Sequence, residues 1–186
     1  MMKIAILSSS VRTGRNSHRV ALFFKNFIEQ NNHAAVELLD LLQYQFPVFE
    51  ERLKFQNPPS ARTIEFAEKI KSADGVLIVT PEYNGGYPAS LKNVIDLLSD
   101  EWKRKPVAIS TVSSGGFAGM NVITSLQYTF WKIQAWTVPA MFPVAKVDES
   151  YDEFGKPSDQ TASEKRAKPF IDELLWCMEA KRRMQS

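Results

Sequence analysis

The chain has 186 residues, of which 44% are hydrophobic, so it is long enough for one substantial core. Its 23 basic residues are interleaved with 21 acidic ones, for a formal net charge of +2, which argues against a nucleic-acid-binding surface. The single cysteine, Cys177, excludes an internal disulfide, and no apolar run is long enough for a signal peptide or a membrane-spanning helix. We therefore expect one domain over residues 1–186, in the cytoplasm, with no nucleic-acid or membrane partner.

The first predicted elements are a strand over Lys3–Leu7 and a helix with apolar residues at helical spacing between Val20 and Ile28. The loop between them is polar and rich in hydroxyl groups. Free N–H groups and the positive end of the helix dipole favour anions at such a helix start, and arginine offers a forked donor for phosphate oxygens. We expect a terminal monophosphate here, although a capped helix with two surface arginines would give the same pattern; the candidates are Ser10, Arg12, Arg15, Asn16 and Ser17.

The middle of the chain predicts a second strand near 35–41, a long aromatic loop over 44–59, a helix near 61–71 and a buried strand over 75–79. A loop with two prolines and two glycines follows, and then a helix that ends near Leu98. Pro81 and Pro88 fix two φ angles, while Gly85 and Gly86 permit positive ones. We expect this loop to turn backbone N–H groups outward toward a planar ligand, the alternative being an ordinary solvated turn; the candidates are Pro81, Glu82, Tyr83 and Asn84.

The last part of the chain predicts a fourth strand over 106–112 and a helix over about 123–133, joined by a loop of small residues that includes Ser113, Gly115 and Gly116. Glycines there allow a flat ligand to approach the backbone closely. A fifth strand over 136–147 contains two prolines, which places it at a sheet edge. A surface loop over Asp148–Asp159 and a final helix over about 160–183 complete the chain.

Strands that alternate with helices predict an α/β fold with a parallel sheet covered on both faces. In the strand order 2-1-3-4-5, the loops after strands one, three and four lie side by side at the carboxyl edge of the sheet. The three polar loops should therefore form one site.

Residues 81–84, PEYN, with Pro88, the run 91–93, LKN, and Ile95-Asp96, resemble the signature of the NADPH-dependent FMN reductase family, the flavodoxin-like quinone, azo-dye and chromate reductases. The resemblance implies a flavodoxin-like fold in which the PEYN loop borders the ring of FMN. Ser113, Gly115 and Gly116 match the loop on the other side of the ring. It also implies a homodimer or homotetramer, with Tyr87, Phe117, Tyr128 and Trp131 either at the interface or packed within one subunit.

The family's phosphate loop reads approximately G-S-x-R-x-x-S-x-N, and this chain matches it in part. Ser10 and Arg12 keep their places. Ser9 stands where glycine is usual, Arg15 where a second serine is common, and Ser17 where asparagine is common.

The sequence contains no Cys/His cluster for a metal and no nucleophile elbow, and His18 is expected on the surface at a helix start. A missing protein acid, base or nucleophile is expected if a bound flavin carries the redox step. The resemblance therefore implies an oxidoreductase in which NADPH or NADH reduces FMN, which then reduces a small-molecule acceptor: a quinone, azo compound, free flavin or metal oxyanion. The alternatives are a flavin-binding electron carrier without NAD(P)H turnover and a non-redox nucleotide or phosphosugar binder.

Overall fold

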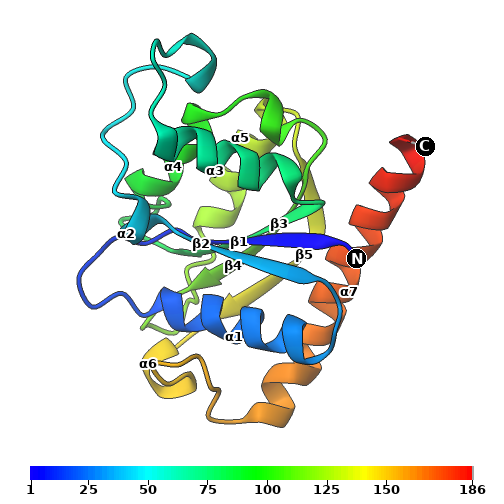
Figure 1. The fold of residues 1–186 in the computed structure, drawn as a ribbon. Coiled ribbons are helices and arrows are strands. Elements are labelled where there is room, and N and C mark those ends of the chain that lie inside the picture. The colour runs from blue at the N-terminus through cyan, green and yellow to red at the C-terminus, as the bar shows by residue number, and fades with distance from the viewer. Residues whose placement is uncertain (186) are drawn as a thin grey trace.

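The computed structural model describes residues 1–185 and shows a five-stranded parallel sheet with helices on both faces (Figure 1). The strand order is β2-β1-β3-β4-β5, as predicted. Every neighbouring pair of strands is parallel. The strands are β1 (Lys3–Ser8), β2 (Ala35–Asp40), β3 (Gly75–Pro81), β4 (Pro106–Val112) and β5 (Trp136–Val144).

The burial of each strand agrees with its place in the sheet. In β3 and β4 almost every residue is buried, because helices cover both faces of the central strands. The edge strands β2 and β5 are only partly buried. The two prolines of β5 lie on an edge strand, where a missing backbone donor is tolerated.

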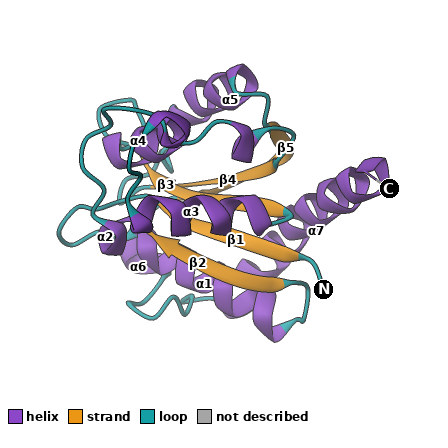
Figure 2. Cartoon of the chain, turned by 45° about the horizontal axis from the view of Figure 1, so that its top comes forward, coloured by secondary structure: helices purple, strands orange, loops and turns teal. Residues whose placement is uncertain are grey.

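The helices form two layers. Helices α1 (Ser17–Gln30) and α7 (Gln160–Gln185) pack against one face of the sheet, and α3 (Ala61–Ser72), α4 (Ala89–Leu97) and α5 (Val122–Lys132) pack against the other (Figure 2). Shorter pieces are α2 (Leu41–Tyr44), α6 (Val147–Ser150), η1 (Leu53–Phe55) and η2 (Asp100–Trp102). Each layer has its own buried apolar cluster.

The segment after β5 differs from the prediction of a surface loop. The strand ends at Val144, α6 follows, and Tyr151 is buried in the core against α1. Gly155 lies so close to α1 that a Cβ atom there would stand 2.6 Å from the backbone nitrogen of Phe23. Its positive φ of 80° is one that glycine adopts without strain. Residues 145–159, which we call the strap, are therefore packed structure that the polar composition concealed.

Candidate functional site

The three predicted loops meet at a cavity of about 210 Å³ at the carboxyl ends of β1, β3 and β4. We call them loop A (residues 9–16), loop B (82–88) and loop C (113–121). Of the predicted site residues, Asn84, Gly115 and Gly116 do not line the cavity, and the others do: Ser10, Arg12, Arg15, Asn16, Ser17, Pro81, Glu82, Tyr83 and Ser113. Three segments distant in sequence thus form one concave site.

Loops A and B contact each other directly. The Ser10 hydroxyl and the Tyr83 phenol share a hydrogen bond of 2.7 Å. Behind them, the Ser90 hydroxyl at the start of α4 donates to the Ser9 carbonyl at 2.6 Å. Loop A is therefore fixed to the segment that carries loop B.

The floor of the cavity contains a buried hydroxyl group without a partner. Ser17 Oγ, in the first turn of α1, has no hydrogen-bond partner within the described residues although its side chain is buried. A buried polar atom left unpaired costs free energy, so such atoms are usually paired. Arg12 at the same cavity is exposed, and the described part of the chain provides no partner for its guanidinium. An unpaired hydroxyl, a free cation and a helix start together suit an anion.

Arg15 has a different environment. Its guanidinium makes two hydrogen bonds to the carboxylate of Asp40, the last residue of β2, and a third, of 2.8 Å, to the Ser10 carbonyl. Burial opposes the ionisation of Asp40. The hydrogen bonds from Arg15 and the Leu42 amide, with the positive charge of Arg15, outweigh it and lower the pKa of Asp40 below its usual value. The carboxylate therefore stays ionised and paired.

His18 is half-buried beneath loop A rather than on the surface, so that prediction was wrong. Its Nδ1 lies 2.9 Å from the Ser8 hydroxyl and 3.9 Å from a carboxylate oxygen of Asp40. Burial, and then the charge of Arg15, lower the pKa of His18, and Asp40 opposes this only in part. The imidazole is therefore held in its neutral form.

Loop B is a tight turn. Asn84 and Gly85 have φ angles of 52° and 80°, whereas Gly86 does not take the positive φ that the sequence allowed. The Tyr83 amide donates to the Gly86 carbonyl at 2.8 Å, so this N–H group does not point outward as predicted. The Glu82 carboxylate accepts from the Asn121 backbone and side-chain amides at 3.2 and 2.9 Å, which joins loop B to loop C.

Loop C is supported by the strap. The Val147 amide donates to the Ser113 carbonyl at 3.1 Å, and Val147 lines the cavity. The Lys146 amide donates to the Gly115 carbonyl at 3.2 Å. Gly115 and Gly116 are exposed, and a Cβ atom at either would contact nothing within 4 Å. Packing therefore does not require glycine at these two positions. The open space beside them leaves room for a ligand to approach the backbone.

Besides Gly14, Val112 and Ser114 of the cavity lining, sequence reasoning missed three residues that shape the site. Asp40 ends the strand beside β1, so the rule that loops gather at the carboxyl edge could have found it. Val147 and Asp148 come from the strap, and the Asp148 carboxylate accepts a hydrogen bond from the Asn16 side chain. No local pattern in the sequence indicates that pairing.

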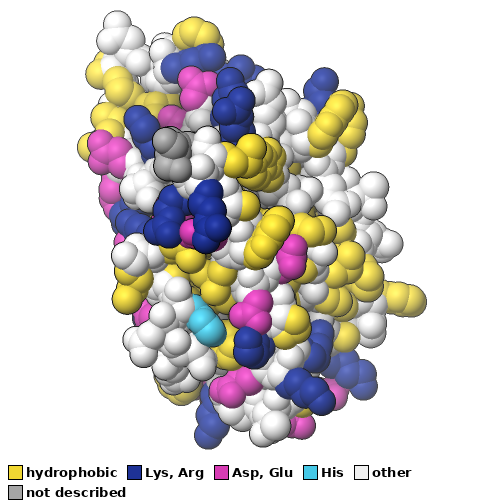
Figure 3. Space-filling model, turned by 90° about the vertical axis from the view of Figure 1, so that its right-hand side faces the viewer, with side chains coloured by type: hydrophobic (Ala, Val, Ile, Leu, Met, Phe, Trp, Pro, Cys, Tyr) yellow, Lys and Arg dark blue, Asp and Glu magenta, His cyan; other side chains and the backbone are white. Residues whose placement is uncertain are grey.

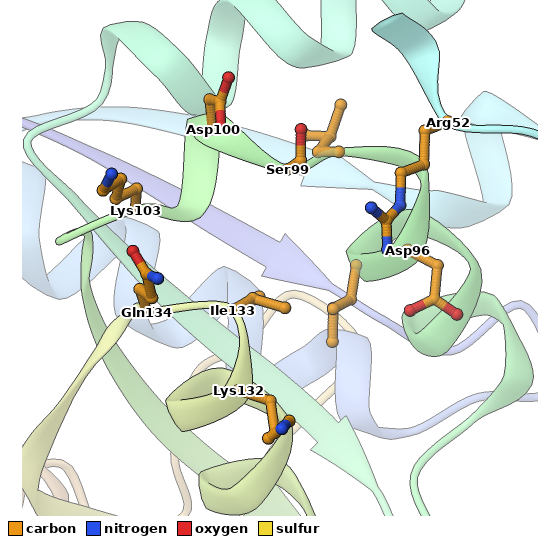
Figure 4. Close-up of a pocket in the computed structure, with 10 residues that line it drawn as sticks. Arg52, Asp96, Ser99, Asp100, Lys103, Lys132, Ile133 and Gln134 are labelled. Carbon is orange, nitrogen blue, oxygen red and sulfur yellow. The ribbon is translucent and has the colours of Figure 1, made fainter. Parts of the chain in front are cut away.

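A second cavity, of about 290 Å³, lies at the opposite edge of the sheet, before β4 and β5 (Figure 4). Its charged lining mixes both signs: Arg52, Lys103 and Lys132 with Asp96 and Asp100. None of the predicted site residues is there. We assign the functional site to the carboxyl edge because that cavity is lined by Arg12 and Ser17, whose side chains have no partner within residues 1–185.

Residues 1–185 contain no cluster of three or more metal-ligating side chains. None of the helices in this range is long and apolar enough to cross a membrane.

The residues at the carboxyl edge suit a flat, phosphorylated ligand. The phosphate would meet Ser10, Arg12 and Ser17, and the ring would meet Tyr83 and the open glycine backbone of loop C. FMN has these two parts. The donors around the cavity therefore fit the phosphate of FMN, and Tyr83 fits its ring.

Known proteins match this chain along most of its length. The family model described as NADPH-dependent FMN reductase matches residues 2–149. The chain is 34% identical over 146 residues to an NAD(P)H-dependent FMN reductase of Schizosaccharomyces pombe, covering 75% of this chain and 72% of the relative. It is 27% identical over 179 residues to a quinone reductase of Pseudomonas putida, covering 92% and 90%.

A solved structure shows the same fold. The flavoenzyme FerB of Paracoccus denitrificans, an NAD(P)H:(acceptor) oxidoreductase, superimposes with a TM-score of 0.78 at 22% identity, covering 97% of this chain and 98% of that chain. The family match spans all three loops. The chain therefore belongs to the NADPH-dependent FMN reductase family, oxidoreductases that use FMN with NAD(P)H as the electron donor.

Proposed function

We propose that this chain transfers reducing equivalents from NAD(P)H through FMN, bound at the carboxyl-edge cavity, to a small quinone. The observation that carries the proposal is the convergence of loops A, B and C, with an unpaired buried hydroxyl at Ser17 beside the free cation of Arg12. The relatives named as FMN reductases support the cofactor. The relative named as a quinone reductase supports the acceptor.

The site has two parts, one for the phosphate and one for the ring. Ser10, Arg12 and Ser17 bind the phosphate, and Asn16 borders it. The ring lies between loop B and loop C; its neighbours are Pro81, Glu82, Tyr83, Asn84, Ser113, Gly115 and Gly116. The Glu82–Asn121 hydrogen bonds hold the two sides of this slot at a fixed separation.

Bound FMN would supply the redox chemistry of the reaction. The protein binds and orients the ring, because none of the residues that line the cavity forms a nucleophile–base pair. The Tyr83 phenol shares a hydrogen bond with the Ser10 hydroxyl, which fixes its ring as a wall of the slot. The buried aliphatic side chain of Val147 forms an apolar part of the cavity lining.

A second copy of the chain belongs to this proposal. Phe117 in loop C is 88% exposed, and Tyr128 and Trp131 on α5 are 62% and 68% exposed. Large exposed apolar side chains commonly mark an interface. We propose a homodimer or homotetramer in which these residues lie at the interface.

The test is anaerobic reduction of the FMN-loaded protein. Addition of NADPH, or of NADH in parallel, should bleach the absorbance near about 450 nm within seconds, and a stoichiometric quinone should restore it. An azo dye, free FMN and a metal oxyanion, added separately, rank the acceptors. Protein that binds FMN but is not bleached would be an electron carrier. Protein that does not bind FMN would be a binder of another phosphorylated ligand.

A further inference from the structure

Arg15 is the residue of loop A at which this chain departs most in chemical type from the family pattern, and its contacts show what it does. Its side chain is 12% exposed and that of Asp40 is 4% exposed. The two form a forked pair in which both terminal nitrogens of the guanidinium donate to the two carboxylate oxygens. Such a pair fixes the direction of both groups.

The same guanidinium also closes loop A on itself. Arg15 is near the end of the loop, and its third hydrogen bond reaches the carbonyl of Ser10 near the beginning, at 2.8 Å. The hydroxyl of Ser10 accepts from the Arg12 amide at 3.3 Å and contacts the Tyr83 phenol at 2.7 Å. The position of Arg15 therefore determines where Ser10, one of the proposed phosphate donors, lies.

Charge argues against a second role for Arg15 as a phosphate ligand. If its guanidinium turned toward the cavity, Asp40 would keep only the Leu42 amide at 3.0 Å and His18 at 3.9 Å. A buried carboxylate that loses its cation is strongly destabilised. Arg12, which is exposed and has no side-chain partner within residues 1–185, needs no such exchange.

We propose that Arg15 is a positioning residue that, through Asp40, holds loop A in its phosphate-binding shape, while Arg12 provides the cation that contacts the phosphate. This inference rests on the proposed function, since it concerns the same FMN site. Asp40 does not line the cavity, and it contacts the lining through Arg15.

The substitution Asp40→Asn distinguishes the two roles by the sign of its effect. Asparagine still accepts from the Leu42 amide and keeps the N-cap of α2, but it cannot pair both oxygens with Arg15. If Arg15 positions the loop, Asp40→Asn weakens FMN binding at least about tenfold. If Arg15 were a phosphate ligand, the variant would free the cation, remove a negative charge, and bind FMN as tightly as the wild type or more tightly.

Riboflavin, which lacks the phosphate, separates positioning from general damage. Fluorescence titrations with FMN and riboflavin should show a large loss for FMN and little change for riboflavin. An equal loss for both ligands would mean that Asp40 only supports the fold, which would overturn the proposal. Glu37→Gln is the matched control, because Glu37 is on the same strand and its ion pairs with Lys3 and Lys69 lie away from the cavity. Its FMN affinity should equal that of the wild type.

Arg15→Lys provides a second, independent variant should Asp40→Asn fail to fold. Lysine keeps the charge but not the planar fork. We expect FMN affinity to fall about tenfold, with the dependence of the dissociation constant on salt unchanged, whereas Arg12→Lys should lose less. Unchanged FMN affinity in Arg15→Lys would overturn the proposal. Wild-type protein that bound no FMN would instead refute the proposed function.

Discussion

The two edges of the sheet are built in opposite ways. At the amino edge, Lys105 is only 3% exposed, and its ammonium group donates to the carbonyls of Lys71 and Ala73 at the end of α3. Asp74 exchanges two hydrogen bonds of 2.8 Å with the backbone of Lys3. At the carboxyl edge, the buried hydroxyls of Ser9 and Ser17 have no partner within residues 1–185. The amino edge satisfies most of its own polar groups, whereas the carboxyl edge leaves the Ser17 hydroxyl unpaired at the cavity.

The two edges should therefore contribute differently, the amino edge to the stability of the fold and the carboxyl edge to ligand binding. The amino edge is closed further by Met178 of α7, whose side chain would lie 2.8 Å from a Cβ atom at Gly75. Figure 3 shows the face beyond this edge, where basic, acidic and apolar side chains are intermixed rather than gathered in one patch. At the amino edge, the buried indole N–H of Trp102 is an exception, because it has no hydrogen-bond partner within residues 1–185. Substitutions at the amino edge should therefore alter unfolding, and those at the carboxyl edge should alter FMN binding.

Trp102→Ala should have the largest effect on stability. Trp102 is fully buried at the amino edge and packs on Phe130, so its truncation should lower the free energy of unfolding by about 3–5 kcal/mol. Urea denaturation measures this loss, and FMN titration at low temperature should give the wild-type affinity. Trp176→Ala, at a side chain 67% exposed, is the control and should change stability by less than about 0.5 kcal/mol. Weaker FMN binding by folded Trp102→Ala would break the comparison.

The next largest effect should be the dependence of the free energy of unfolding on pH that Lys105 causes. Burial, and then the charge of Lys181, lower the pKa of Lys105 to about 8, against the opposing charge of Asp74. Between pH 8 and roughly 10.4 the unfolded chain binds more protons at this lysine than the folded chain does. The free energy of unfolding of the wild type should therefore rise with pH across this range, by about 2–4 kcal/mol relative to Lys105→Met. Parallel curves for the two proteins would contradict this assignment.

Arg12→Ala should weaken FMN binding by about 1.5–3 kcal/mol, or roughly 10- to 150-fold, through the loss of a charge-assisted hydrogen bond to the phosphate. Its free energy of unfolding should not change, since the side chain is exposed. Lys71→Ala removes one positive charge at the other edge of the sheet and serves as the matched control. Equal FMN affinities for the two variants would place the phosphate elsewhere.

His18→Asn should have the smallest effect. Because the folded protein lowers the pKa of His18, the neutral imidazole stabilises the fold near neutral pH, and this stability is lost as the pH falls below about 6.5. Asparagine can keep the Ser8 hydrogen bond without titrating. The variant should therefore lose less stability than the wild type between about pH 7.5 and 5.5. His33→Asn is the control; if it, rather than His18→Asn, flattened the curve, the titrating group would be misassigned.

Much of the fold could be predicted from the sequence, because the relevant signals are local. Continuous apolar runs marked the buried strands β3 and β4, and the phenylalanines of α1 repeat at helical spacing and are buried. The parallel order then placed loops A, B and C together, which is how nine site residues from distant segments could be named in advance as lining one cavity.

The parts that could not be predicted depend on tertiary pairing. Nothing in the sequence of loop A shows that Arg15, which lines the cavity, pairs its guanidinium with Asp40. The Tyr83 amide is occupied because Asn84, rather than Gly86, takes a positive φ, and either residue could have done so. Residues 148–159 are mostly polar, so their composition did not indicate that Tyr151 and Gly155 are buried. The contacts of these two residues are enough to fix the short segment.

The strap has a consequence for how the site matures. Val147 and Asp148 are joined to residues of loops C and A, and Asp148 lies 132 positions from its partner Asn16. A chain still emerging from the ribosome can pair β1 with β3 well before this segment is made. Contacts of such high sequence separation close late, so the cofactor pocket should be completed only after β5 has docked. Appearance of FMN fluorescence quenching during refolding would then report the final step of assembly rather than the first collapse.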